Sequence, residues 1–266
     1  MTYSTDIAVD IPIRTLTVDS LTVHVYPSAN AVAVAASSHA ADILRQASAA
    51  EGEASAVFAT GRSQKQCLSY LTDSAKTTLD WQKITGFHLD EYLGLSAAHP
   101  ASFRQYFDTH LTSKVNLKAF HEICGDELLP IEVCEQYEQK LRARSLNLCF
   151  LGIGNNGHLA FNDPDVADFS DPRWVKLVRL DEVNRQQQLS TTAFDQIEAV
   201  PQYAFTLTLS ALKSIQHNLC LAFGEGKSEV VRSILTGPIT PKCPASILRQ
   251  IPQSVLMLDT AAAELI

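Results

Sequence analysis

Short apolar runs alternate with helical patterns along almost the whole chain, and this alternation constrains the fold more than any other feature. The apolar runs are 21–26, 54–60, 84–89, 146–153, 174–180, 203–208, 218–223 and 255–258. Between them, apolar residues recur at three- and four-residue spacing over 29–49, 64–72, 102–111, 131–144 and 227–235. That spacing predicts helices with one buried face. Strands that alternate with helices predict an α/β fold, with an open, mostly parallel sheet and helices on both faces.

Composition bounds the kind of protein. The chain has 266 residues, of which 46% are hydrophobic, so it can bury a full core without disulfides or metal ions. We find no repeat or long linker and expect one domain over residues 1–266. The formal net charge of −8 argues against a surface for nucleic acid or anionic membranes. It leaves room for a small anionic ligand, because a few N–H groups and one or two cations suffice for a phosphate.

The chain also shows no sign of export. No apolar stretch reaches the ~18 residues of a membrane span, and the first 20 residues lack the pattern of a signal peptide. The six cysteines form no C-x-x-C pair. We therefore expect reduced thiols and a cytoplasmic location.

Four loops that follow predicted strands carry the unusual residues: 60–65, 88–95, 152–164 and 224–227. Ligands of parallel α/β sheets bind beyond the carboxyl ends of the strands. These loops are therefore where a site is expected.

The first and fourth loops suggest an anion site. Gly61 permits close approach of a ligand to the backbone before a helix, and Arg62 and Ser63 would add a charge and a hydroxyl donor. Lys227 follows a glycine-rich turn and could reach the same anion. The alternative is an ordinary strand-to-helix turn and a solvated lysine.

The second loop places Asp90 and Glu91 at the end of an apolar strand. Buried carboxylates are costly unless they are paired or used. Neighbouring strand residues point to opposite faces, so one carboxylate can face a ligand while the other makes a structural hydrogen bond. The first could be a general base for a carbon-bound proton. A metal site built from His88, Asp90 and Glu91 is the alternative.

The third loop, 152–164, follows the most apolar run and reads GIGNNGHLAFNDP. Its glycines and asparagines indicate positive φ angles or close approach to a ligand. His158 with Asp163 nearby is typical of proton transfer near neutral pH. The glycine spacing superficially matches a dinucleotide fingerprint, but Pro164 and Pro172 leave little room for the helix that this motif needs.

Together these loops resemble the glucosamine/galactosamine-6-phosphate deaminase (isomerase) family, whose fold is a Rossmann-like open sheet. The segments that carry the resemblance are FHLDEYLGL (87–95), GIGNNGHLAFNDP (152–164), VPQYA (200–204), GEGK (224–227) and GPITPKCPASIL (237–248). They occur in the family's order and span most of the chain.

The resemblance implies a mechanism. His158 would assist opening of the pyranose ring, oriented by Asp163 and by Asn156. Asp90 would remove the C2 proton and return one to C1 through an enolamine. The ketose imine would then be hydrolysed to ammonia and a ketose 6-phosphate, a reaction grouped with the hydrolases of cyclic amidine-type C–N bonds.

The resemblance also implies a phosphate site made of Gly61, Arg62, Ser63 and Lys227, with no metal or organic cofactor. The phosphate-binding arginine expected after the fifth strand has Arg185 as its nearest candidate. Glu91 is a further candidate for the site.

Two departures bear on the substrate. The glucosamine enzymes usually carry Asp where this chain has Asn156, and Glu where it has Asp163. The Asn-Gly-His version resembles the galactosamine branch, whose product is tagatose 6-phosphate instead of fructose 6-phosphate. Both sugars stay open as substrates.

Two rival functions are considered. A 6-phosphogluconolactonase would share the fold and phosphate site, but its histidine loop usually continues Thr-Ala-Ser, whereas this one continues Leu159-Ala160-Phe161. A non-catalytic sensor of sugar phosphates would usually carry a DNA-binding extension, and none is evident. A homo-oligomer is compatible with the sequence, which does not fix the oligomeric state.

Overall fold

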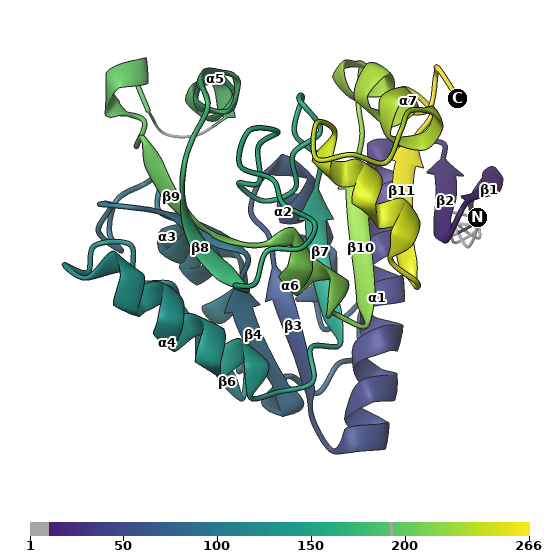
Figure 1. Cartoon of the computed structure of the whole chain (residues 1–266). Helices are drawn as coiled ribbons and strands as arrows, with labels where there is room; N and C mark the ends of the chain where they lie inside the picture. Colours follow the sequence, from purple (N-terminus) through teal and green to yellow (C-terminus); the bar gives the residue numbers. More distant parts are fainter. Residues whose placement is uncertain (1–10, 192–193) are drawn as a thin grey trace.

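The computed structural model describes residues 11–191 and 194–266. Its strands form two sheets, which Figure 1 shows with the connecting helices. The strands are β1 (Arg14–Val18), β2 (Leu21–Tyr26), β3 (Ala54–Phe58), β4 (Ile84–His88), β5 (Asp90–Tyr92), β6 (Ala119–His121), β7 (Leu148–Gly152), β8 (Val175–Arg179), β9 (Tyr203–Leu207), β10 (His217–Ala222) and β11 (Ser254–Asp259). The α-helices are α1 (Ala29–Glu51), α2 (Arg62–Leu71), α3 (Phe103–Phe107), α4 (Pro130–Arg142), α5 (Glu182–Thr191), α6 (Leu209–Lys213) and α7 (Ser228–Thr236).

Shorter helical turns complete the connections. The 3₁₀ turns are η1 (Trp81–Lys83), η3 (Ile197–Ala199), η4 (Glu225–Lys227) and η5 (Pro244–Gln250), and α3 continues into a π-helical turn, η2 (Asp108–Thr112).

The larger sheet has eight strands in the order β1-β2-β11-β10-β7-β3-β4-β6. Every neighbouring pair is parallel except β1 with β2, so the predicted mostly parallel sheet is confirmed. From β3 the chain builds outward through β4 to β6, returns to place β7 beside β3, and then builds the other way through β10 and β11. The switch point therefore lies between β3 and β7, where an α/β sheet opens a crevice for ligands.

Both faces of this sheet carry a hydrophobic core. Along β7, Leu148 and Phe150 belong to one buried cluster, while Cys149 and Leu151 belong to the other. This follows from the alternation of side chains along a strand. α1 and α2 pack on the first face, whereas residues of α7 and η5 belong to the second cluster. Helices on both faces are thus confirmed.

The smaller sheet is antiparallel, in the order β5-β9-β8, and it was not predicted as a separate sheet. Only Leu89 separates β4 from β5, so the chain passes from the larger sheet to the smaller one at this residue. β5 spans only Asp90–Tyr92, too short to show a period of its own. This crossing sets the direction of the Asp90 side chain.

Eight apolar runs of the sequence correspond to strands, and five periodic segments correspond to helices. The elements that the sequence did not predict are β1, β5, β6, α5 and α6, each of which is short or polar. α5 is the most consequential of them, because it borders the site described below. The interpretation of residues 1–266 as one domain stays a prediction.

Candidate active site

A cavity of about 360 Å³ lies at the carboxyl ends of β3, β4, β7 and β10, beside the switch point. Polar residues from all four predicted loops line it, together with two glutamines of α5. The lining residues that bear on the argument are Gly61, Arg62, Ser63, Asp90, Gly154, Asn155, His158, Gln187, Gln188 and Lys227. The volume suits a small ligand.

The first loop forms one wall of this cavity. Gly61 precedes α2 with a φ of 106°, a conformation that favours glycine. Arg62 and Ser63 begin α2, whose first N–H groups have no acceptor within the helix and carry its positive dipole end. A helix N-terminus of this kind can bind an anion, and the phosphate role of these residues stays a prediction.

Lys227 approaches the same cavity from the turn after β10. Its Nζ donates to the Ile153 carbonyl and to Asn155 Oδ1, both at 2.7 Å. Burial lowers the pKa of Lys227 from its ordinary value. The two hydrogen bonds hold the ammonium group at the cavity wall, on the side of the glycine-rich loop.

Asp90 lines the cavity, and its residue is only 7% exposed. Among the residues that the structure describes, no ion pair or side-chain hydrogen bond compensates its carboxyl group. Burial, and then the charge of Glu91, raise the pKa of Asp90 well above its usual range. A buried acid of this kind, open to a cavity, is typical of a catalytic acid or base.

Glu91 lies next to Asp90 and has the opposite environment. Its carboxylate accepts from the Ser102 hydroxyl and from the backbone N–H groups of Tyr92, Phe103 and Arg104, at 2.9–3.0 Å. Burial raises the pKa of Glu91, and these hydrogen bonds oppose the shift. Glu91 does not line the cavity. The structure places its carboxylate as the hydrogen-bond acceptor at the start of α3.

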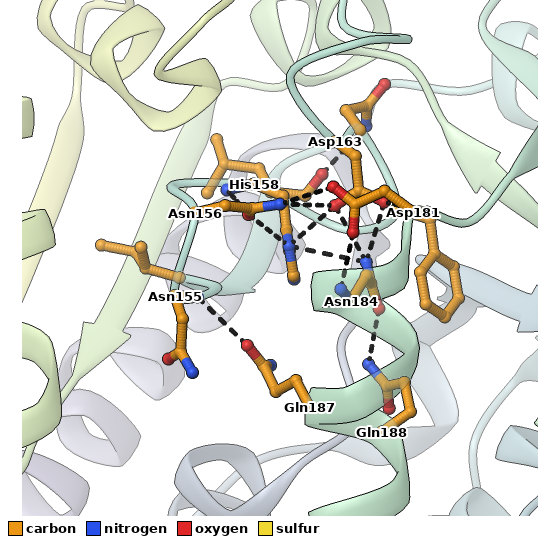
Figure 2. A network of polar contacts seen from close by, with 12 residues as sticks. Asn155, Asn156, His158, Asp163, Asp181, Asn184, Gln187 and Gln188 are labelled. Atoms are coloured by element: carbon orange, nitrogen blue, oxygen red, sulfur yellow. Dashed lines mark hydrogen bonds and ion pairs between the residues drawn. The ribbon is translucent and has the colours of Figure 1, made fainter. Parts of the chain in front are cut away.

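His158 lines the cavity. Its Nδ1 lies 2.7 Å from Asn156 Oδ1 and 3.0 Å from Asp163 Oδ1, as Figure 2 shows. Both neighbours are acceptors, so Nδ1 carries the proton and Nε2 is left as the acceptor nitrogen. The imidazole is thus oriented as a proton acceptor.

Gly154 explains part of the glycine pattern. The imidazole of His158 packs directly on its backbone, and a Cβ at position 154 would overlap the ring atoms. The loop also closes on itself, since Gly154 N–H donates to the His158 carbonyl at 3.0 Å. Gly157 has a φ of 82°, as predicted for this motif, so the glycines shape a loop around a histidine instead of a nucleotide.

Asp163 is buried beneath His158. It accepts from Asn156 Nδ2 at 3.1 Å, and Asn184 Nδ2 lies 3.1 Å from each of its oxygens. Burial alone would raise the pKa of Asp163, but hydrogen bonds and the charge of His158, with Asn156 and Asn184, hold it below its ordinary value. Asp163 therefore stays ionised beside the imidazole.

Comparisons with known proteins identify the family. Residues 27–257 match the family model described as glucosamine-6-phosphate isomerases/6-phosphogluconolactonase. The chain belongs to this family. A glucosamine-6-phosphate deaminase of Exiguobacterium sibiricum is 32% identical over 209 residues, which are 79% of this chain and 80% of that protein. One of Cellvibrio japonicus is 34% identical over 188 residues, 69% of each chain.

Solved structures extend the likeness. A monomeric glucosamine-6-phosphate deaminase is 28% identical, with a TM-score of 0.84, over 92% of this chain and 99% of that one. A 6-phosphogluconolactonase of Trypanosoma brucei is 17% identical, with a TM-score of 0.74, over 94% of this chain and 99% of that one. The second likeness shows the shared fold alone.

Arg185, the nearest candidate for a phosphate-binding arginine, is hydrogen-bonded to main-chain carbonyls. Its Nη2 donates to the carbonyls of Ile197 (2.5 Å) and Val200 (3.1 Å), and its Nη1 lies 3.5 Å from Glu182. Arg185 does not line the cavity. Its hydrogen bonds instead connect α5 to the following turn, η3.

The alternative metal site is also not assembled. His88 is fully buried among aromatic rings, with its imidazole 4.7 Å from Phe107 and 5.3 Å from Phe120, and burial lowers its pKa to about 3. Glu91 is engaged elsewhere. In the parts of the chain that the structure describes, no group of three His, Cys, Asp or Glu side chains could hold a metal ion.

The sequence missed the contribution of α5. Its face carries Asn184, Gln187 and Gln188, three and four residues apart, toward the cavity and the histidine loop. Gln187 Oε1 accepts from Asn155 N–H at 3.1 Å, and Gln188 donates to Asn184 Oδ1 at 3.1 Å. The available signal was Asp181, a helix-capping residue just after an apolar strand.

The role of Glu91 can be tested by stability. Replacing Glu91 with Ala would leave the Ser102 hydroxyl and several N–H groups buried without an acceptor. Because each such group costs about 1–3 kcal/mol, we expect a loss of several kcal/mol in the free energy of unfolding, measured by denaturant titration. Glu127→Ala, at an exposed position, is the control. Equal stability of the two variants would contradict a structural role for Glu91.

Proposed function

We propose that this protein converts an aminosugar 6-phosphate into a ketose 6-phosphate and ammonia. The observation that carries the proposal is the uncompensated Asp90 carboxyl, which lines the same cavity as the oriented imidazole of His158 and the N-terminus of α2. Membership of the family and the names of the relatives support the same reaction class.

The phosphate group would bind where α2 begins. Gly61 lets the anion approach the backbone, Ser63 adds a hydroxyl, and Arg62 and Lys227 supply positive charge. Lys227 would exchange one of its present hydrogen bonds for a phosphate oxygen. This places the sugar between that wall and the Asp90 and His158 side chains.

His158 would open the ring by moving the proton of the C1 hydroxyl to the ring oxygen through Nε2. Asp90 would then take the C2 proton while the ammonium group of the substrate passes a proton to O1, so that the C1–C2 double bond of an enolamine forms. Return of a proton to C1 leaves an imine at C2. Water adds to this imine and ammonia leaves, so the electrons and atoms balance without an oxidant.

Burial of Asp90 suits this role. A raised pKa makes the carboxylate a stronger base, and the developing enolamine is stabilised by the amine lone pair of the substrate. Asp163, which stays ionised, would stabilise the imidazole while it carries a proton. Asp90 and Asp163 thus differ in environment, as a base and an ionised partner of the imidazole require.

Two sugars are candidate substrates. The names of the relatives favour glucosamine 6-phosphate, whereas the Asn156-Gly157-His158 motif favours galactosamine 6-phosphate. We also propose that the protein works in the cytoplasm, since its six cysteines are free thiols. No helix in the described residues is long and apolar enough to cross a bilayer.

The base assignment predicts the behaviour of Asp90→Asn. Ammonia release from either sugar should fall at least about 10³-fold, because the group proposed to take the C2 proton is lost. The melting temperature at neutral pH should stay the same or rise, since a buried carboxyl group without a compensating partner is removed. Ammonia release and thermal unfolding measure the two effects. Undiminished turnover would refute the assignment, and lactone hydrolysis that survives the substitution would favour a lactonase.

The raised pKa of Asp90 predicts a pH dependence. Below this pKa the carboxyl is protonated and cannot act as a base, so kcat/KM should fall on the acid side well above the pH of about 4 at which an ordinary aspartate titrates. The folded state holds this proton more tightly than the unfolded chain, so the contribution of Asp90 to stability is lost as pH rises. Carboxyl carbon NMR, assigned with the Asp90→Asn variant, should show the same titration. An ordinary value would contradict the account.

The packing of His158 on Gly154 predicts the result of Gly154→Ala. The added methyl group would push the imidazole from its place, so ammonia release should fall about 10²-fold or more. Gly226→Ala, where a methyl group would meet open space, is the control and should keep most of its activity. Full activity in Gly154→Ala would show that the imidazole position is not needed.

A further inference from the structure

Asn156 lies between the imidazole of His158 and the carboxylates of Asp163 and Asp181. Its Oδ1 faces the backbone N–H of His158 at 3.1 Å and the Nδ1 at 2.7 Å. Its Nδ2 donates to Asp163 Oδ1 and to Asp181 Oδ2, both at 3.1 Å. Every hydrogen-bonding position of the amide is used.

The amide orientation follows from these partners. In the opposite orientation, the amide oxygen would face two carboxylates and the amide nitrogen would face two N–H donors of His158. Only one arrangement satisfies all four partners, as Figure 2 shows.

Asp181, which accepts from the Asn156 amide, also contacts α5. It precedes α5, and its Oδ1 accepts from the Asn184 N–H at 2.6 Å, which caps the helix. Its other oxygen receives the Asn156 amide. Asn184 in turn donates to Asp163 and accepts from Gln188, a residue that lines the cavity. The cap of α5 is therefore joined to the histidine loop.

We infer that Asn156 and Asp181 form a compensating pair of positioning residues, in which the amide at 156 is required by the carboxylate at 181. The pair fixes the imidazole of His158 against Asp163 and seats α5 over the cavity. This inference deepens the proposed function and rests on it for its activity readout.

The charges explain why the two positions depend on each other. With Asn156, the network holds the carboxylates of Asp163 and Asp181, joined by one amide. With Asp at 156, a third carboxylate oxygen would lie where Nδ2 now sits, 3.1 Å from each of the other two. Carboxylates that share a site cannot all ionise without cost, so this change is unfavourable by itself.

Asparagine at 181 alone is also unfavourable. An asparagine can still cap α5 with its oxygen, since Asn and Asp are equally good caps. Its amide nitrogen would then face the Asn156 Nδ2, donor against donor. When both positions are exchanged, the Asn at 181 donates to the Asp at 156, so one of the two carboxylate contacts of Asn156→Asp is replaced by a hydrogen bond, while the contact with Asp163 remains.

The test is a double-mutant cycle with the full chain, using Asn156→Asp, Asp181→Asn and the double variant. Ammonia release and thermal unfolding are measured for each. Asn156→Asp should lose about 50-fold in kcat/KM and several degrees in melting temperature, and Asp181→Asn should lose less in both. The double variant should lose less activity and less melting temperature than Asn156→Asp alone, because one of its two carboxylate contacts has become a hydrogen bond. Asp165→Asn, an exposed carboxylate in the same loop, is the control.

The outcomes are separable. Additive losses, or a single Asn156→Asp variant as active and stable as the wild type, would overturn the inference. If Asn156→Asp does not fold, recovery of folded protein in the double variant is the supporting result, and its failure the opposing one. If the wild type releases no ammonia from either sugar, the proposed function fails, and the cycle of melting temperatures still tests the pair.

Discussion

A buried carboxylate without a compensating partner costs folding free energy, and the site is organised around one such group. Asp90 lies where the chain leaves the larger sheet for the smaller one, and it is only 7% exposed. Burial and the charge of the neighbouring Glu91 both make the ionised form of Asp90 unfavourable, and the rest of the structure must offset this free-energy cost. The stability to do so comes from the two hydrophobic cores that cover the sheet.

Three acids near the cavity show how the environment divides roles. Asp90 has no donor beside it among the described residues and is open to the cavity, Glu91 is surrounded by donors and lies away from it, and Asp163 is hydrogen-bonded beneath an imidazole. Identical or similar groups therefore acquire different proton affinities. The same principle extends to α5, whose cap and buried amide complete the surroundings of His158.

Much of the fold and site could be predicted from the sequence, because the decisive residues follow strong apolar strands. Such strands end at one edge of a parallel sheet, so Gly61, Asp90, His158 and Lys227 had to converge. What could not be predicted depends on side-chain direction. Glu91 differs from Asp90 only by one position, and the crossing between sheets decides which of them faces the cavity. α5 has a polar sequence without a clear period, and Arg185 could not be told from Gln187 until the helix was placed.

The account rests on Asp90 and His158 acting on neighbouring atoms of one phosphosugar. The most direct measurement is a crystal structure of the Asp90→Asn variant with an aminosugar 6-phosphate bound. We expect the phosphate at the N-terminus of α2, the C2 hydrogen directed at residue 90, and the C1 or ring oxygen within hydrogen-bond distance of His158 Nε2. A sugar bound with C2 turned away from residue 90, or with its phosphate at another part of the molecule, would contradict the account.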